Sequence, residues 1–296
     1  NALGSMIGGA AIGILGPVIV ADGKLESYYV LIFGSMALTL VLSIGGAFSV
    51  KERVGFEENK EAKYSLKEML QFLRYKPVWA AFVATLILGT GSSVAGGAGA
   101  YFFTYILGDI KLMSGVSIIG LIASPVGIVM GPYLANRFGK KKVYLTAVIL
   151  STALNLLRLL DVTSMILIYI SALIGGVAGG CMVPVNTSIQ ADNTTYVQYK
   201  TGKRAEAAIA SLTSFVSKVA QGLGGAIPGY VIAASGFVAG ATIQPESINA
   251  GIIFCVLILP LIFGVLGAII FGTQYTLDQN MVVEMDTKMA ENGSKN

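Results

Sequence analysis

Long apolar segments alternate with short polar ones along most of the chain. Eight segments are long enough to cross a bilayer, because a spanning helix needs about 20 mostly apolar residues. They cover residues 2–20, 28–50, 78–107, 113–134, 142–160, 165–188, 206–235 and 249–272. The pattern predicts an all-α polytopic membrane protein with about eight transmembrane helices.

Composition supports this class and excludes others. The chain is 54% hydrophobic and only 12% charged, whereas a soluble domain carries about 25% charged residues. It has no histidine, and no nucleophile–base pair stands out in the apolar segments, so we expect no enzyme and no metal site built on histidine or thiolate ligands. Cys181 and Cys255 both lie in apolar segments and are expected to pack as small hydrophobic residues.

The basic residues indicate an orientation. Most of the 20 lysines and arginines fall in residues 51–76, 137–142, 200–204 and the tail, while Lys24, Lys111 and Arg158 mark the opposite side. Cytoplasmic loops carry an excess of Lys and Arg. We therefore place the basic side, and both ends of the chain, in the cytoplasm beneath the cell's inner membrane. Charge spread over short loops does not suggest a nucleic-acid partner.

One lysine, Lys218, lies inside an apolar segment, more than ten residues from either end of 206–235. A charge at that depth is expensive unless it faces a wet cavity or a partner. Ser211, Ser214, Gln221 and Gly225 share its helical face and form a narrow polar stripe. We interpret the stripe as a functional site; the alternative is a lysine that snorkels to a lipid headgroup.

The acidic residues offer Lys218 no partner in this sequence. All 16 lie in loops, in the tail or near the ends of apolar segments. A buried ammonium needs a counter-charge, or it loses its proton. We therefore expect carboxylates on helices that precede this chain, for which the ammonium would compete with a proton or Na⁺.

The polar stretch 51–77 divides the spans into two and six. Ser65 and Glu68 form a capping box, and the residues that follow predict a short amphipathic helix on the membrane face that ends at Pro77; its apolar stripe is Leu66, Met69, Leu70 and Leu73. Many transporters join two six-helix halves by such a linker. We therefore expect 1–50 to be the last two helices of an amino-terminal half, 51–77 the linker, 78–273 a six-helix carboxy-terminal half and 274–296 a cytoplasmic tail. The chain starts with Asn directly before an apolar segment, so we expect it to be the later part of a longer protein.

Small residues recur every fourth position in the third span, at Gly89, Ser93 and Gly97, and two tyrosines follow at Tyr101 and Tyr105. This face either lines a cavity or packs closely against a neighbouring helix, and the tyrosines are alternatively interface anchors. We take Tyr101, Tyr105 and Asn186 as candidate cavity-lining residues.

Residues 191–206, ADNTTYVQYKTGKRAE, followed by the helix of Lys218, resemble the glycoside–pentoside–hexuronide:cation symporters, the melibiose-carrier-like branch of the major facilitator superfamily. The family pattern is roughly A-D-x-x-D-Y-G-E-W-K-T-G-K-R-x-E. Thr195, Val197, Gln198 and Tyr199 depart from it, which removes two acids. Residues 134–141, LANRFGKK, are similar to the superfamily loop L-A-D-R-x-G-R-R, with Asn136 in place of the acid, and Tyr275-Thr-Leu-Asp278 is similar to the family's ending.

The resemblance implies a major-facilitator helix bundle, with this chain equivalent to helices 5–12 of twelve. It implies a monomeric sugar symporter in a lipid bilayer, coupled to a monovalent cation, H⁺ or Na⁺, with no other cofactor. It places Lys218 between the sugar and cation sites, with Ser214 near the cation. The polar stripe adds Ser211 and Gln221 to the candidate coupling residues. We expect gating by the cytoplasmic loops, where charge pairs can hold the inner ends of two helix bundles together; the alternative is that these charges only set the topology. The candidate gating residues are Arg137, Gly139, Lys140, Tyr196, Lys200, Thr201, Gly202 and Arg204. The alternatives are another major-facilitator solute or a membrane protein that does not transport.

Overall fold

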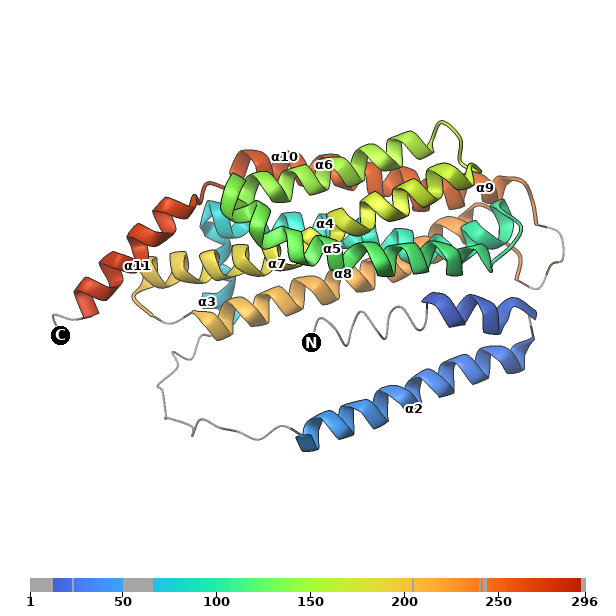
Figure 1. The fold of residues 1–296 in the computed structure, drawn as a ribbon, viewed down its shortest axis with the longest axis horizontal. Helices are drawn as coiled ribbons and strands as arrows, with labels where there is room; N and C mark the ends of the chain where they lie inside the picture. Colours follow the sequence, from blue (N-terminus) through green and yellow to red (C-terminus); the bar gives the residue numbers. More distant parts are fainter. Residues whose placement is uncertain are drawn as a thin grey trace.

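The structure is a computed structural model that describes residues 13–22, 24–49, 66–203, 205–239, 241 and 244–293. Helices account for nearly all of these residues, and no strand occurs among them. This confirms the predicted all-α class, and Figure 1 shows the elongated helices. Arg204 and most of the stretch 51–77 lie outside the described residues.

The elements follow one another with short connections. Residues 13–19 are helical and continue into η1 (Val20–Asp22). The next elements are α2 (Leu25–Ser49), α3 (Leu66–Gln71), η2 (Phe72–Arg74), α4 (Lys76–Tyr101), the π-helical η3 (Phe102–Ile106), α5 (Leu112–Phe138) and α6 (Lys140–Arg158). The remaining elements are α7 (Met165–Thr201), α8 (Glu206–Ala234), α9 (Ser247–Ile253), the π-helical η4 (Phe254–Ile258), α10 (Leu259–Gln274) and α11 (Gln279–Gly293).

Five helical stretches of the described chain are long and apolar enough to cross a membrane. They are Leu25–Gly45, Lys76–Ile106, Leu112–Phe138, Met165–Thr201 and Ser247–Gln274. The other two long helices, α6 and α8, are also predicted spans but are more polar, because α6 begins with three lysines and α8 carries the stripe around Lys218. The first predicted span, 2–20, is described only from residue 13.

Helices α4 to α10 form one bundle, in which α5 packs on α7, α4 on α8 and α10, and α6 on α7 and α10. The α5–α7 contact depends on glycine. A Cβ added at Gly127 would overlap the carbonyl oxygen of Val177, and one added at Gly180 would overlap that of Ser124. Small residues are how membrane helices approach each other closely. In α2, by contrast, none of the apolar window in Leu25–Gly45 is buried.

The prediction that residues 136–142 and 192–204 are loops is wrong for most of their length, since among the described residues only Gly139 and residues 202–203 lie outside helices there. Helix α5 runs to Phe138 and α6 begins at Lys140, with Gly139 alone between them at φ +89°. Helix α7 continues to Thr201, because no glycine or proline interrupts residues 185–201. Gly202 then ends it with a left-handed φ of +68°, a conformation that glycine adopts without steric strain.

The described end of the linker also differs from the prediction. The short helix exists as α3, but Pro77 does not end it: it occupies the first turn of α4, where a proline needs no hydrogen-bonded N–H. The predicted apolar stripe is divided. Met69 and Leu73 pack with the buried Phe72 against a cluster that includes residues of α8, while Leu70 is exposed. The segment is therefore partly docked onto the bundle instead of lying only on the membrane face.

Candidate functional site

Helix α8 presents its polar stripe on an open side and its small residues on a packed side. The exposed positions of the stripe are Ser211, Ser214, Lys218, Gln221 and Gly225. On the other side Ala220, Gly224 and Pro228 are buried and lie against α4. The close contact with α4 fixes the rotation of α8, so the stripe faces away from the six-helix bundle.

The ammonium of Lys218 has one weak polar contact. Its Nζ lies 3.4 Å from Oε1 of Gln221, one turn further along the helix. An amide oxygen does not neutralise a positive charge. Lys218 forms no ion pair with a carboxylate of the described residues, unlike Lys140, which pairs with Asp192, and Lys288, which pairs with Glu284. In the same ranges no group of three His, Cys, Asp or Glu residues is placed to hold a metal ion.

The small residues of α4 pack against α8, and Gly89 in addition lines a cavity, so both alternatives hold for part of this face. A Cβ on Gly89 would lie 3.2 Å from the Cβ of Ala220, and one on Gly97 would lie 3.3 Å from Cγ of Pro228. The tyrosines beyond them form an aromatic cluster. Tyr101 and Tyr105 stack with ring centroids 6.2 Å apart, and both meet the ring of Phe237 edge-on, at 5.6 and 5.9 Å.

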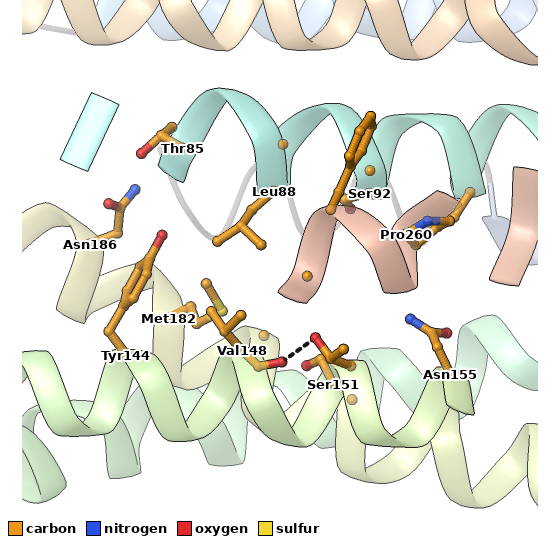
Figure 2. Close-up of a pocket in the computed structure, with 18 of the residues that line it drawn as sticks. Thr85, Leu88, Ser92, Tyr144, Val148, Ser151, Asn155, Met182, Asn186 and Pro260 are labelled. Atoms are coloured by element: carbon orange, nitrogen blue, oxygen red, sulfur yellow. Dashed lines mark hydrogen bonds between the residues drawn. The ribbon is translucent and has the colours of Figure 1, made fainter. Parts of the chain in front are cut away.

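A cavity of about 530 Å³ lies between α4, α6, α7 and α10. Figure 2 shows Tyr144 and Asn186 at one end of it and Asn155 near Pro260 at the other. Its polar lining residues are Thr85, Ser92, Tyr144, Ser151, Thr152, Asn155 and Asn186. Thr152 is already engaged, because its hydroxyl donates to the carbonyl of Val148 at 2.7 Å. The size and mixed lining of the cavity are those of a small-molecule site, which usually measures about 300–1,000 Å³.

Of the candidate lining residues, Asn186 lies at this cavity and Tyr101 and Tyr105 do not. Sequence reasoning missed the contribution of α6. Tyr144, Ser151 and Asn155 are spaced seven and four residues apart, which puts them on one helical face. That polar stripe is a signal of the same kind as the one around Lys218, but without a charge to draw attention to it.

The predicted gating residues lie at the end of the bundle where α6 and α11 begin. Lys140 Nζ donates to both carboxylate oxygens of Asp192 on α7, at 2.7 and 2.8 Å. Lys141 Nζ donates to the carbonyl oxygen of Tyr275 at 2.6 Å. These contacts join the ends of α6, α7 and α10, all within the predicted six-helix half. For Lys140 the structure therefore provides a partner in its own bundle.

The other gating candidates make weaker contacts. Lys200 Nζ lies 5.8 and 5.9 Å from the ring centroids of Tyr196 and Tyr199. The guanidinium carbon of Arg137 lies 5.4 Å from the ring centroid of Phe138. The hydroxyl of Thr201 donates to the carbonyl of Val197 at 2.8 Å and is thus used within α7. Tyr196, Lys200 and Thr201 belong to helix α7, not to a loop.

An aromatic stack connects the cavity to the end of the bundle that holds the gating candidates. The ring of Phe271 lies 4.3 Å from that of Tyr144 and 4.6 Å from that of Tyr275. Burial raises the pKa of the Tyr275 phenol far above its ordinary value, and the charge of Asp192 adds to the shift. The phenol therefore stays protonated as a neutral donor, and its oxygen has no partner among the described residues.

Comparison with known proteins identifies the family. A family model described as MFS/sugar transport protein matches residues 1–279. The chain belongs to this family. The match agrees with the resemblance to melibiose-carrier-like members of the major facilitator superfamily, and it makes the chain a multi-pass membrane protein of a transport family, not of an enzyme family.

Individual members of the MFS/sugar transport family are similar over most of the chain. A glucuronide carrier protein homolog of Escherichia coli (strain K12) is 28% identical over 84% of this chain and 57% of its own length. An isoprimeverose transporter of Lactiplantibacillus pentosus is 26% identical over 82% of this chain and 51% of its own length. A raffinose carrier protein of Pediococcus pentosaceus is 24% identical over 81% of this chain and 39% of its own length. The chain thus spans about half the length of these curated relatives.

Proposed function

We propose that this chain forms the carboxy-terminal part of a sugar:cation symporter of the inner membrane. Its substrate would be a glycoside, pentoside or hexuronide, and its coupling ion H⁺ or Na⁺. Three features support the proposal: the family match, the sugar carriers among the relatives, and the coverage of only about half of their lengths.

The observation that carries the proposal is the open polar face of α8. Lys218 lies on that face without a carboxylate partner among the described residues, in the middle of a helix that we take to span the membrane. A charge at this depth needs a polar cavity or an opposite charge. Carboxylates on preceding helices, facing Lys218 across a central cavity, would meet that need.

Cation coupling follows from the same arrangement. Two positive charges compete for one set of carboxylates, so the ammonium and the coupling ion would occupy that site in alternation. Ser214 lies one turn before Lys218 on the exposed face, where its hydroxyl can supply an oxygen ligand to the ion. The polar cavity of Figure 2 would take part of the sugar.

The orientation completes the proposal. The end of the bundle with Lys140, Lys200 and α11 would face the cytoplasm, because it carries most of the described basic residues. The ion pair Lys140–Asp192 would then keep the cytoplasmic ends of α6 and α7 together while the two halves of the transporter move.

Uptake by the complete protein that contains this chain tests the proposal. Proteoliposomes would be given a panel of radiolabelled neutral glycosides, pentosides and hexuronides, with a Na⁺ gradient, a proton gradient or neither. We expect at least one sugar to accumulate above its external concentration with one of the two gradients only. Absence of gradient-dependent accumulation across the whole panel would contradict symport.

A further inference from the structure

A second cavity, of about 520 Å³, adjoins the one in Figure 2. The two share the polar residues Ser92, Ser151 and Asn155, and also Ala95 and Gly175. Because they share this lining, a ligand in the first cavity can extend into the second. The far end of the second cavity, away from Tyr144 and the Lys140–Asp192 pair, is lined by Arg158, the last residue of α6.

Arg158 is mostly buried and has little to neutralise it. Its guanidinium carbon lies 5.4 Å from the ring centroid of Phe102, and its Nε is buried without a hydrogen-bond partner among the described residues. No carboxylate in the described ranges forms an ion pair with it. The acid three residues away, Asp161, instead accepts hydrogen bonds from Thr163 and Ser164.

A guanidinium in this position is a strong anion receptor. It stays protonated in proteins, so it cannot escape the burial by losing a proton as a lysine can. An aromatic face compensates only part of the lost hydration. Its rigid fork of N–H donors matches an oxyanion group with two parallel hydrogen bonds. Arg158 therefore favours a ligand whose oxyanion group reaches the far end of the second cavity.

The rest of the combined space suits a sugar. The hydroxyls of Ser92 and Ser151 and the amide of Asn155 line the shared region and both donate and accept hydrogen bonds, as sugar hydroxyls do. Phe102 and Phe103 also line this cavity, but both are buried, so they form an apolar wall and do not offer an open face for a sugar ring.

We propose that Arg158 is a specificity residue that binds the carboxylate or sulfonate of an anionic sugar, with the sugar ring between Arg158 and the shared polar residues. This inference rests on the proposed transport function and adds a substrate class to it: acidic sugars are preferred over neutral ones of the same ring size. A cavity of about 520 Å³ next to one of 530 Å³ leaves room for a glycosidic substituent in the first.

Equilibrium binding to the purified complete protein tests the inference. The probes are sodium D-glucuronate, the neutral methyl β-D-glucoside and sodium acetate, each titrated calorimetrically at constant ionic strength. The variants are Arg158→Gln, Arg158→Lys and the control Arg74→Gln, an exposed arginine at the end of η2. We expect the wild-type protein to bind glucuronate at least about tenfold more tightly than the glucoside, which is 1.4 kcal/mol.

The variants separate a specificity role from a structural one. Arg158→Gln is expected to remove the preference for glucuronate and leave glucoside binding within about threefold, a change of under 1 kcal/mol. Arg74→Gln is expected to change neither. If Arg158→Gln fails to fold, Arg158→Lys still decides, because a compact ammonium should weaken glucuronate binding several-fold without affecting the glucoside.

Three results would overturn the inference. The first is equal affinity of the wild-type protein for glucuronate and the glucoside, and the second is an equal loss of affinity for both sugars in the Arg158 variants. The third is acetate binding as tight as glucuronate binding, which would leave a simple anion site. Failure of the proposed function is distinguishable, because it would appear as no gradient-driven uptake of any sugar in the panel. Uptake of neutral sugars without a preference for acidic ones would reject only the role of Arg158.

Discussion

Lys140 and Asp192 form a bidentate ion pair, 2.7 and 2.8 Å long, that joins the first turn of α6 to the last third of α7. Their side chains are only 21% and 10% exposed. Removing one partner from such a pair leaves a poorly solvated charge, which is more damaging than the loss of an exposed pair. The pair is therefore expected to stabilise the bundle as well as any gate to which it contributes.

We predict that Asp192→Asn lowers the free energy of unfolding by about 2–3 kcal/mol, less than the 3–5 typical of a fully buried pair. Thermal unfolding of the complete protein in detergent measures the change. The control is Glu284→Gln, which removes the exposed pair with Lys288 on α11 and should have no measurable effect, since exposed pairs contribute little. Equal unfolding temperatures for Asp192→Asn and wild type would show that the pair does not stabilise the fold.

The α5–α7 contact gives a second stability prediction. Gly127→Ala places a methyl group into the backbone of α7 at Val177, and overpacking of this kind typically costs about 1–3 kcal/mol. We expect a lower yield of monodisperse protein by size-exclusion chromatography. Gly120→Ala on the same helix meets nothing within 4 Å and should behave as wild type. A normal yield for Gly127→Ala would mean that the helices separate more easily than the packing indicates.

The proposed orientation predicts which lysines a membrane-impermeant thiol reagent can reach. In a background with Cys181 and Cys255 replaced by Ala, Lys200→Cys and Lys288→Cys should be labelled only in inside-out vesicles. Lys111→Cys, between η3 and α5, is the control and should be labelled only in intact cells. Each of the three lysines is exposed, so access to the reagent depends on the side of the membrane. The reverse labelling pattern would invert the topology.

The cavity residues give a prediction about sugar affinity. Asn155→Ala and Asn186→Ala each remove an amide that lines the cavity of Figure 2. A hydrogen bond of this kind contributes about 1–1.5 kcal/mol, so each change should weaken sugar binding about tenfold. Asn136→Ala alters an exposed amide near the end of α5 and serves as the control. Wild-type affinity in both cavity variants would place the sugar elsewhere.

The helical class and most of the spans could be predicted from hydrophobic periodicity, because a lipid environment requires long apolar helices. The ends of the helices could not. The polar sequence after residue 188 looks like a loop, yet it continues α7 by more than three turns. Asp192 in this stretch finds a partner in Lys140 at the end of the bundle, while the buried amides of Gln190 and Asn193 keep atoms without a partner among the described residues. Such partners depend on packing between distant segments, which the sequence does not display.

The candidate site was predictable where a charge interrupts an apolar pattern and not where the signal is a neutral polar stripe. Lys218 and its stripe were identified, and the structure places them together on the open side of α8. Tyr144, Ser151 and Asn155 of α6 were missed, although their spacing puts them on one face. The small residues of α4 were compatible with packing or with cavity lining, and only the position of α8 decides that most of them are packed.

The central claim concerns Lys218, and the most direct measurement is gradient-driven sugar uptake by the complete protein carrying Lys218→Met. We predict normal insertion but no accumulation above the external concentration, because the proposed carboxylates would lose the charge that competes with the coupling ion. Lys218→Arg should restore accumulation only partly, since a planar guanidinium does not replace a compact ammonium. Lys111→Met, which removes an exposed lysine near the start of α5, should accumulate sugar as wild type does. Normal uphill uptake by Lys218→Met would contradict the account and leave Lys218 as a packing or snorkelling residue.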